Sequence, residues 1–118
     1  MSQEIALRNL RNLVIDMDGV LYRGDQLIAG TRELIGFLRE HGIGFVLATN
    51  NATRTPQQFI DKLAGMAVQV YTHEVLTSSL ATASYLAGIA PPGAKVFVVG
   101  MDGLRSALEG TGFRLVED

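Results

Sequence analysis

Cysteine is absent from this chain of 118 residues, and neither sign of charge is in large excess. Without cysteine, disulfide bonds and thiolate metal sites are excluded, and the redox compartment stays open. The 10 basic and 12 acidic residues give a formal charge of -2 with no basic run, so electrostatic attraction to nucleic acid is not expected. No apolar run is long enough to cross a bilayer, and residues 1–13 carry polar and charged side chains where a signal peptide would be apolar. We therefore expect no nucleic-acid partner, no membrane partner and a cytoplasmic location.

Two acidic residues follow an apolar segment near the start of the chain. The segment Leu13–Ile15 is typical of a buried parallel strand, and Asp16-Met17-Asp18-Gly19 comes directly after it. In open α/β sheets, ligands bind beyond the carboxyl ends of the strands. Residues two apart point the same way, so Asp16 and Asp18 are expected to share a site, and Gly19 allows a sharp turn. Two carboxylates this close repel each other unless a cation lies between them, which favours Mg²⁺; a plain surface turn is the alternative.

A second apolar segment, Phe-Val-Leu-Ala, ends in polar side chains of a different kind. Thr49, Asn50 and Asn51 follow it, and the residues that separate the two segments have the spacing of a helix. The connection in such a βαβ unit makes its two strands parallel, so Thr49 and Asn50 are expected at the same sheet edge as the two aspartates. Their hydroxyl and amide groups suit a phosphoryl group as hydrogen-bond donors. The alternative is that Asn51 or Thr53 caps a helix beginning near Pro56.

Helix-like and strand-like segments alternate along the rest of the chain. The expected helices are residues 30–44, 56–63, 80–86 and 101–108, and the later extended segments are residues 68–71, 75–76, 95–99 and 114–116. Thr77 or Ser78 is expected to cap the third of these helices, and Asp102 is the expected cap of the last. The alternation predicts an α/β fold in which a mainly parallel sheet is covered by helices on both faces.

Several motifs occur together in a fixed order. They are Asp16-Met17-Asp18-Gly19-Val20-Leu21-Tyr22-Arg23-Gly24, then Gly30 with Glu33-Leu34, then Thr49-Asn50-Asn51, then Thr77-Ser78-Ser79 with Ala83-Ser84-Tyr85-Leu86. With these motifs the chain resembles the N-terminal half of a haloacid dehalogenase superfamily phosphatase, of the para-nitrophenyl phosphatase or NagD type. The resemblance extends from Asn12 to Asp118 and implies a Rossmann-like, three-layer α/β core.

The resemblance also implies roles for individual residues. Asp16 is the expected nucleophile, which takes the phosphoryl group as an aspartyl phosphate, and Asp18 is the expected general acid and base. Both residues are expected to hold Mg²⁺, Asp16 through its carboxylate and Asp18 through its backbone carbonyl. Thr49, Asn50 and the backbone amides after Asp16, at Met17 and Gly19, are the expected phosphate-binding groups. The implied substrate is a small phosphorylated metabolite.

Two parts of the family pattern are missing. Members have a third motif with a lysine and a fourth with one or more aspartates, and neither motif is found here. The two lysines of the chain, Lys62 and Lys95, are not expected to take the place of the missing lysine. We therefore expect residues 1–118 to be the N-terminal part of the core domain, without the cap domain and the C-terminal part of the core. An incomplete sheet leaves an exposed edge, which favours a homodimer.

Other functions are weighed against the phosphatase. A catalytically inactive α/β fragment that binds phosphate or associates with itself is the main alternative. A doubly wound nucleotide-binding domain is weaker, because no Gly-x-Gly-x-x-Gly turn follows the first strand. Tyr22 and Arg23 are expected to be solvated loop residues; the resemblance implies the alternative, a flap in this region that gates access to the site. His41 and His73 lack the spacing of metal ligands and are expected at the surface or at a helix end.

Overall fold

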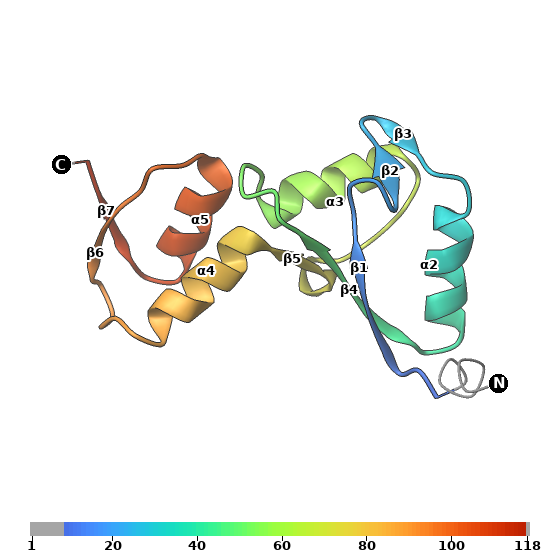
Figure 1. The fold of residues 1–118 in the computed structure, drawn as a ribbon, viewed down its shortest axis with the longest axis horizontal. Coiled ribbons are helices and arrows are strands. Elements are labelled where there is room, and N and C mark those ends of the chain that lie inside the picture. Colours follow the sequence, from blue (N-terminus) through green and yellow to red (C-terminus); the bar gives the residue numbers. More distant parts are fainter. Residues whose placement is uncertain (1–8, 118) are drawn as a thin grey trace.

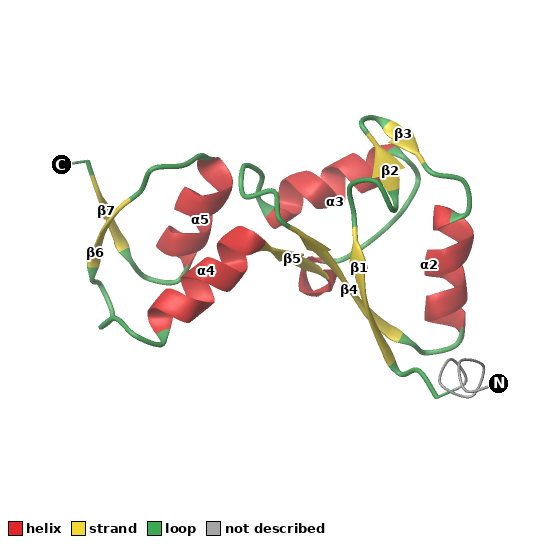
Figure 2. Ribbon diagram, in the orientation of Figure 1, coloured by secondary structure: helices red, strands yellow, loops and turns green. Residues whose placement is uncertain are grey.

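The computed structural model describes residues 9–117 and has an α/β architecture (Figure 1). The strands are β1 (Asn12–Asp16), β2 (Tyr22–Arg23), β3 (Gln26–Leu27), β4 (Gly44–Thr49), β5 (Val75–Thr77), β6 (Lys95–Phe97) and β7 (Arg114–Val116). The helices are α2 (Thr31–Glu40), α3 (Pro56–Gly65), the short 3-10 turn η1 (Thr72–Glu74), α4 (Ser78–Ala87) and α5 (Asp102–Gly110). Figure 2 shows how helices and strands alternate along the chain, as the sequence indicated.

The first sheet positions the residues that matter most for function. It has the order β1-β4-β5, and both of its strand pairs are parallel. In this register Asp16 lies beside Ala48, and Thr49 lies beside Thr77. The carboxyl ends of β1 and β4 therefore meet at one edge of the sheet, and the predicted parallel pairing of these two strands is confirmed.

One face of the first sheet is packed against α2 and α3. Leu47 on β4 is fully buried together with Leu38 of α2 and Leu63 of α3, with exposed fractions of 0%, 2% and 0%. These helices have their apolar residues at helical spacing, so each presents one apolar stripe to the sheet. The opposite face carries Val14 and Leu76, which remain 77% and 43% exposed. A helical layer on that second face is not seen among residues 9–117.

The last part of the chain forms a sheet of its own. Strands β6 and β7 pair in parallel with each other and with no strand of the first sheet. Together with α4 and α5 they enclose a separate cluster of buried apolar residues, which contains Ala83, Val98, Ala107, Leu108 and Phe113. The α/β class with mainly parallel strands is confirmed, but the strands are divided among three sheets, because β2 and β3 form a small antiparallel pair of their own. Helix α4 leads the chain away from β5, and β6 and β7 lie apart from the first sheet (Figure 1).

The helix starts differ in part from the expectation. Thr55 caps α3: its Oγ1 accepts from the Gln58 N–H at 3.2 Å, while its own N–H donates to Gln58 Oε1 at 2.9 Å. The alternative that Asn51 or Thr53 caps this helix is therefore wrong, because the helix begins later than those residues.

The caps of the two later helices also follow from hydrogen bonding. Thr77 caps α4 and accepts from the Leu80 N–H at 3.1 Å, as expected. Asp102 is not a cap, because α5 begins at Asp102 itself and the preceding Met101 occupies the cap position without a side-chain bond. Among residues 9–117, no helix has both the length and the apolar character needed to cross a membrane.

Candidate active site

The turn after β1 places the first acidic residues. Gly19 has a backbone φ of +82°, a conformation that side-chain-bearing residues rarely adopt, so the predicted sharp turn is confirmed. The turn is closed by two backbone bonds, from the Leu21 N–H to the Met17 carbonyl and from the Gly19 N–H to the Tyr22 carbonyl, both 2.8 Å long. Met17 is fully buried between the aspartates and anchors the turn in the core. Asp16 and Asp18 are both left exposed to solvent.

The end of β4 supplies the polar groups on the neighbouring strand. Thr49 is 9% exposed, and its Oγ1 accepts from the Asn51 N–H at 3.1 Å. Accepting this bond leaves the hydroxyl hydrogen of Thr49 available for donation. The backbone carbonyl of Asn50 accepts a bond from the Ser78 hydroxyl at 3.1 Å, which fixes the backbone next to Thr49 while the Asn50 side chain stays exposed.

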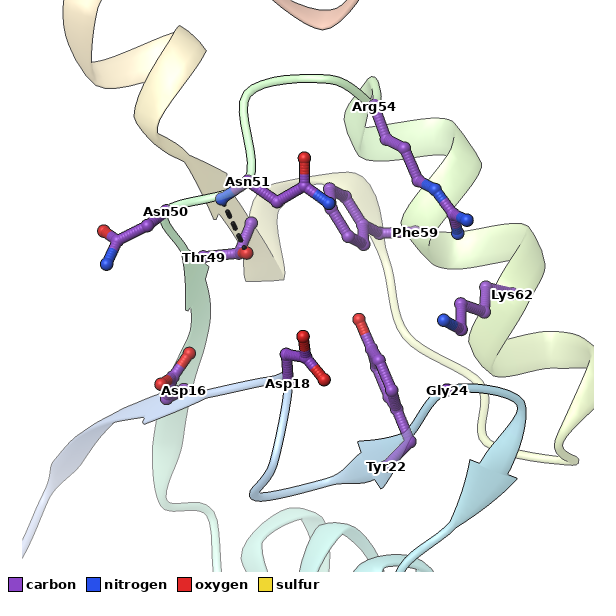
Figure 3. A pocket seen from close by; sticks show the side chains of 10 residues that line it. All are labelled: Asp16, Asp18, Tyr22, Gly24, Thr49, Asn50, Asn51, Arg54, Phe59 and Lys62. Carbon is purple, nitrogen blue, oxygen red and sulfur yellow. Dashed lines mark hydrogen bonds between the residues drawn. The ribbon is translucent and has the colours of Figure 1, made fainter.

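These two strand ends meet in one cavity of about 390 Å³ (Figure 3). Four residues that the sequence singled out line it: Asp16, Asp18, Thr49 and Asn50. The volume is in the range of sites for small molecules. A second hollow of about 490 Å³ shares Asp16, Thr49 and Asn50, so these three residues lie between the two hollows.

Two of the expected phosphate-binding groups are engaged elsewhere. The Met17 N–H donates to Asp16 Oδ1 at 2.8 Å, and the Gly19 N–H closes the turn onto the Tyr22 carbonyl. A backbone N–H has a single hydrogen to donate, so neither group is free for a phosphate in this conformation. The geometry therefore does not support phosphate binding by Met17 and Gly19, whereas the Thr49 hydroxyl and the Asn50 amide remain available.

The cavity also contains residues that sequence reasoning missed. Arg54, Phe59 and Lys62 line it together with the predicted residues. Sequence reasoning assigned Lys62 no place in the site, whereas the structure puts it at the cavity; that it does not replace the missing lysine of the third motif stays a prediction. A signal was present, because Phe59, Lys62 and Leu63 share one face of a helix at spacings of three and four residues. Phe59 and Leu63 face the core, so Lys62 at the border of that face points toward the strand ends.

Tyr22 forms one wall of the cavity. It is only 3% exposed, and its ring lies 4.2 Å from the Lys62 ammonium, measured to the ring centroid. Burial raises the pKa of the Tyr22 hydroxyl, the nearby carboxylates of Asp18 and Asp16 raise it further, and Arg54 opposes them. The hydroxyl is therefore a neutral hydrogen-bond donor at physiological pH. Tyr22 lies in β2 and belongs to the buried core, so the expectation that it is a solvated loop residue is wrong.

The decisive observation on family comes from comparison with known proteins. A family model described as haloacid dehalogenase-like hydrolase matches residues 13–114. The chain belongs to this family. The match spans β1 from its second residue, Asp16 at its end and Asp18 after it, β4 with its polar end, and most of the chain beyond them.

Individual relatives agree with the family assignment. The chain is 38% identical over 112 residues to an acid sugar phosphatase of Staphylococcus aureus, an alignment that covers 95% of this chain and 43% of that protein. It is 31% identical to NagD from E. coli K-12, with a TM-score of 0.82 over 91% of this chain and 42% of that one. It is 29% identical to a glycerol phosphate phosphatase from Mycobacterium tuberculosis solved with magnesium, with a TM-score of 0.83 over 92% of this chain and 32% of that one.

These comparisons confirm the resemblance to the NagD type of haloacid dehalogenase-like hydrolase. They also show that the chain spans about 43% of the length of the curated relatives that it matches. The catalytic roles of individual residues stay predictions.

The cavity offers carboxylate oxygens of the kind that Mg²⁺ prefers as ligands. Among residues 9–117, no group of three or more His, Cys, Asp or Glu side chains is arranged to hold a metal ion. Mg²⁺ does not need such a cage, because it is usually bound by one or two carboxylates together with waters and substrate phosphate. The carboxylates of Asp16 and Asp18, which line the same cavity, fit this requirement. Asp16 Oδ1 already accepts a bond from Met17, which fixes the orientation of its carboxylate.

The loop between β4 and α3 is held in place by the later part of the chain. The Ser79 hydroxyl donates to the Ala52 carbonyl at 3.2 Å, and the Gly103 N–H donates to the Thr53 carbonyl at 3.2 Å. A side chain at Gly103 would collide with the carbonyl groups of Ala52 and Arg54. In this family member, the glycine at position 103 therefore lets the backbone of α5 come close enough to support the loop that carries Arg54 into the cavity.

Proposed function

We propose that the site hydrolyses phosphomonoesters of small metabolites with the help of Mg²⁺, within the longer enzyme that the relatives represent. The observation that supports this proposal is the meeting of Asp16, Asp18, Thr49 and Asn50 in one cavity at the carboxyl ends of two paired parallel strands. Two carboxylates beside a free hydroxyl and a free amide combine a nucleophile, a proton carrier and donors for phosphoryl oxygens. The related acid sugar phosphatase and glycerol phosphate phosphatase support the same class of reaction.

The chemistry follows from the placement of the two aspartates. An Asp16 carboxylate oxygen attacks the phosphorus atom, and the bond from phosphorus to the leaving oxygen breaks as Asp18 gives that oxygen its proton. Asp18, now ionised, takes a proton from water, and the water oxygen attacks phosphorus so that the bond to Asp16 breaks and inorganic phosphate forms. Met17 holds Asp16 through its N–H, which limits the rotation of the nucleophile. Thr49 and Asn50 donate to the phosphoryl oxygens.

Mg²⁺ has a defined place in this proposal. The Asp16 carboxylate and the Asp18 backbone carbonyl would hold the ion, which would neutralise charge on the transferring phosphoryl group.

Hydrolysis of para-nitrophenyl phosphate by the longer enzyme, with and without Mg²⁺, tests the proposal directly. We expect turnover that requires Mg²⁺ and that falls by about 10³-fold or more in Asp16→Asn, because that variant lacks the nucleophile. Asp25→Asn is the matched control, since Asp25 is an exposed acid in the same loop region that does not line the cavity. Equal activity of wild type and Asp16→Asn would contradict the proposed nucleophile.

A second measurement does not depend on turnover. Trifluoroberyllate is an analogue of a phosphoryl group that binds to aspartate carboxylates in the presence of Mg²⁺, and its bound fluorine atoms are detected by ¹⁹F NMR. We expect bound signals with wild type and Asp25→Asn and none with Asp16→Asn. Bound signals without any hydrolysis would favour the alternative of an inactive phosphate-binding domain for this chain on its own.

A further inference from the structure

Hydrogen bonds around Thr49 extend beyond the cavity to the first residue of α4. Oγ1 of Thr49 accepts from the Asn51 N–H at 3.1 Å, a bond drawn in Figure 3. The carbonyl of Asn50 belongs to the same peptide group as that N–H, and it accepts from the Ser78 hydroxyl at 3.1 Å. Both polar atoms of this one peptide group are therefore engaged, the N–H by Thr49 and the carbonyl oxygen by Ser78.

Ser78 is well placed to hold this peptide group. The preceding residue, Thr77, is 1% exposed, lies beside Thr49 in the paired strands and caps α4 with its side chain. Ser78 is then the first residue of α4, and its own carbonyl accepts from the Thr82 hydroxyl at 2.7 Å. Its backbone is fixed by the sheet on one side and by the helix on the other, whereas Asn50 is exposed and follows the last residue of β4.

The orientation of this peptide group decides how the Thr49 hydroxyl is used. A hydroxyl has one hydrogen to donate and two lone pairs that accept. While the Asn51 N–H is directed at Oγ1, the oxygen accepts and the hydroxyl hydrogen stays available for a phosphoryl oxygen. In a planar trans peptide the carbonyl and the N–H point in opposite directions, so turning the group over would bring the Asn50 carbonyl toward Thr49. That carbonyl would accept the hydroxyl hydrogen and remove a donor from the cavity.

We propose that Ser78 is a positioning residue for phosphoryl transfer at this site. By holding the Asn50 carbonyl, it keeps the next N–H directed at Thr49 and leaves the Thr49 hydrogen for the phosphoryl group. A bond to an amide carbonyl also polarises the N–H of the same peptide group, which strengthens its bond to Thr49. The inference rests on the proposed function, because it takes the role of Thr49 from it. It links the start of α4 to a cavity of about 390 Å³ that Ser78 itself does not line.

Hydrolysis of para-nitrophenyl phosphate by the longer enzyme in the presence of Mg²⁺ measures the effect. Ser78→Ala is expected to lower kcat/KM about tenfold, the loss that corresponds to one hydrogen bond. Ser78→Thr keeps a hydroxyl at the same position and is expected to recover most of the activity. Ser84→Ala is the matched control, because Ser84 is exposed on α4 and does not line the cavity. Circular dichroism of each variant confirms that it is folded.

A double-mutant cycle distinguishes positioning from general support of the fold. Thr49→Val removes the hydroxyl, keeps the shape of the side chain and is expected to lower kcat/KM about 10²-fold. If Ser78 acts through that hydroxyl, adding Ser78→Ala to Thr49→Val causes no further loss. Ser79→Ala is the comparison, because the Ser79 hydroxyl holds the Ala52 carbonyl further along the same loop. Its effect is expected to multiply with that of Thr49→Val.

The outcomes separate this inference from the function on which it rests. Unchanged kcat/KM in Ser78→Ala, or a loss that Ser78→Thr does not recover, overturns the inference and leaves the hydrolase proposal intact. A further tenfold loss when Ser78→Ala is added to Thr49→Val also overturns it, because Ser78 then acts independently of the hydroxyl. Wild-type activity in Thr49→Val overturns the role of Thr49 and this inference, but not the role of Asp16. Absence of turnover by the wild type overturns the proposed function and the inference together.

Discussion

The chain consists of two units that differ in the size of their sheets and buried cores and in whether they carry residues of the proposed site. The first unit, residues 12–77, has a three-stranded parallel sheet, a core with fully buried residues such as Met17, Leu47 and Leu63, and every residue proposed to act on substrate. The second unit, residues 78–116, has a two-stranded sheet and a smaller buried cluster around Leu108.

The difference shows how a core and a site depend on each other. Asp16 and Thr49 occupy strand ends whose positions are set by residues packed immediately before them, such as Leu47. The second unit contributes no side chain to the cavity of about 390 Å³, but its Ser79 hydroxyl and its Gly103 N–H support the loop that carries Arg54. The comparison predicts that destabilising substitutions in the first unit remove ligand binding. Substitutions in the second unit should change ligand affinity only where they disturb this loop.

The largest effect is expected from a cavity in the first core. Leu63→Ala removes a side chain with 0% exposure and should lower the free energy of unfolding by about 3 kcal/mol. Binding of phosphate ligands should be lost together with the fold, as measured by urea unfolding and NMR titration. Leu108→Ala is the matched change in the second unit, and we expect the sheet that carries Asp16 to keep its ligand affinity. Equal loss of affinity in both variants would show that the two units form one cooperative structure.

The contact between the units is expected to be next in size. Gly103→Ala places a Cβ atom against the backbone carbonyls of Ala52 and Arg54, and overpacking of this kind costs about 2 kcal/mol. Because the clash displaces the loop beside the cavity, affinity for phosphate ligands should fall as well. Gly110→Ala lies in the same helix with open space around its Cβ position and should change neither quantity. Unaltered ligand affinity in Gly103→Ala would mean that the second unit does not support the site.

A smaller effect is expected from the ion pair at the far end of the first sheet. Glu74 is 6% exposed, and its two carboxylate oxygens accept from Arg39 at 2.8 Å and 2.9 Å. Burial by itself raises the pKa of Glu74, but the bonds from Arg39 and from the Tyr71 N–H outweigh it and leave the pKa below 4.5. Glu74→Gln should cost about 1.5 kcal/mol at neutral pH, at the low end for bonds to a charged group, because Arg39 is partly exposed.

The pH dependence of that cost has a definite sign. The contribution of Glu74 is fully present above its pKa in the unfolded chain, and it is lost as the pH falls through the lower pKa of the folded chain. The difference in unfolding free energy between wild type and Glu74→Gln should therefore shrink below about pH 4.5. Urea unfolding at pH 7 and pH 3 measures it, and a constant difference would contradict an ionised Glu74 in the folded protein. Ligand affinity at neutral pH should not change, because Glu74 does not line the cavity.

The smallest effect is expected at the start of α3. Thr55→Ala removes the hydroxyl that accepts from the Gln58 N–H and should cost about 1 kcal/mol. Thr55→Ser keeps the accepting oxygen and should remain near the wild type. Since α3 carries Lys62, thermal unfolding and ligand titration together show whether fraying of this helix reaches the cavity. A loss as large in the Ser variant as in the Ala variant would assign the effect to packing of the methyl group.

Local patterns predicted most helices, strands and turns well, but the cap of α3 was misassigned although its cause is also local. The Thr77 cap and the turn at Gly19 depend on neighbours within a few residues, and both were predictable. The cap of α3 was placed too early because Asn51, Thr53 and Thr55 are all capping residues in sequence. Only Thr55 is followed by Gln58 at the spacing of a reciprocal pair, and that pairing decided the start of the helix.

The sequence by itself determined the family, the two aspartates and the order of strands and helices, because these depend on short motifs and on periodicity along one segment. Only the tertiary structure decided that β6 and β7 form a separate sheet, since strand partners are chosen by hydrogen bonds across space. It also decided that Lys62 and Tyr22 meet the aspartates in one cavity. Their position in one cavity depends on how α3 packs against the first sheet. The spacing of residues along the chain does not specify how a helix is oriented on a sheet.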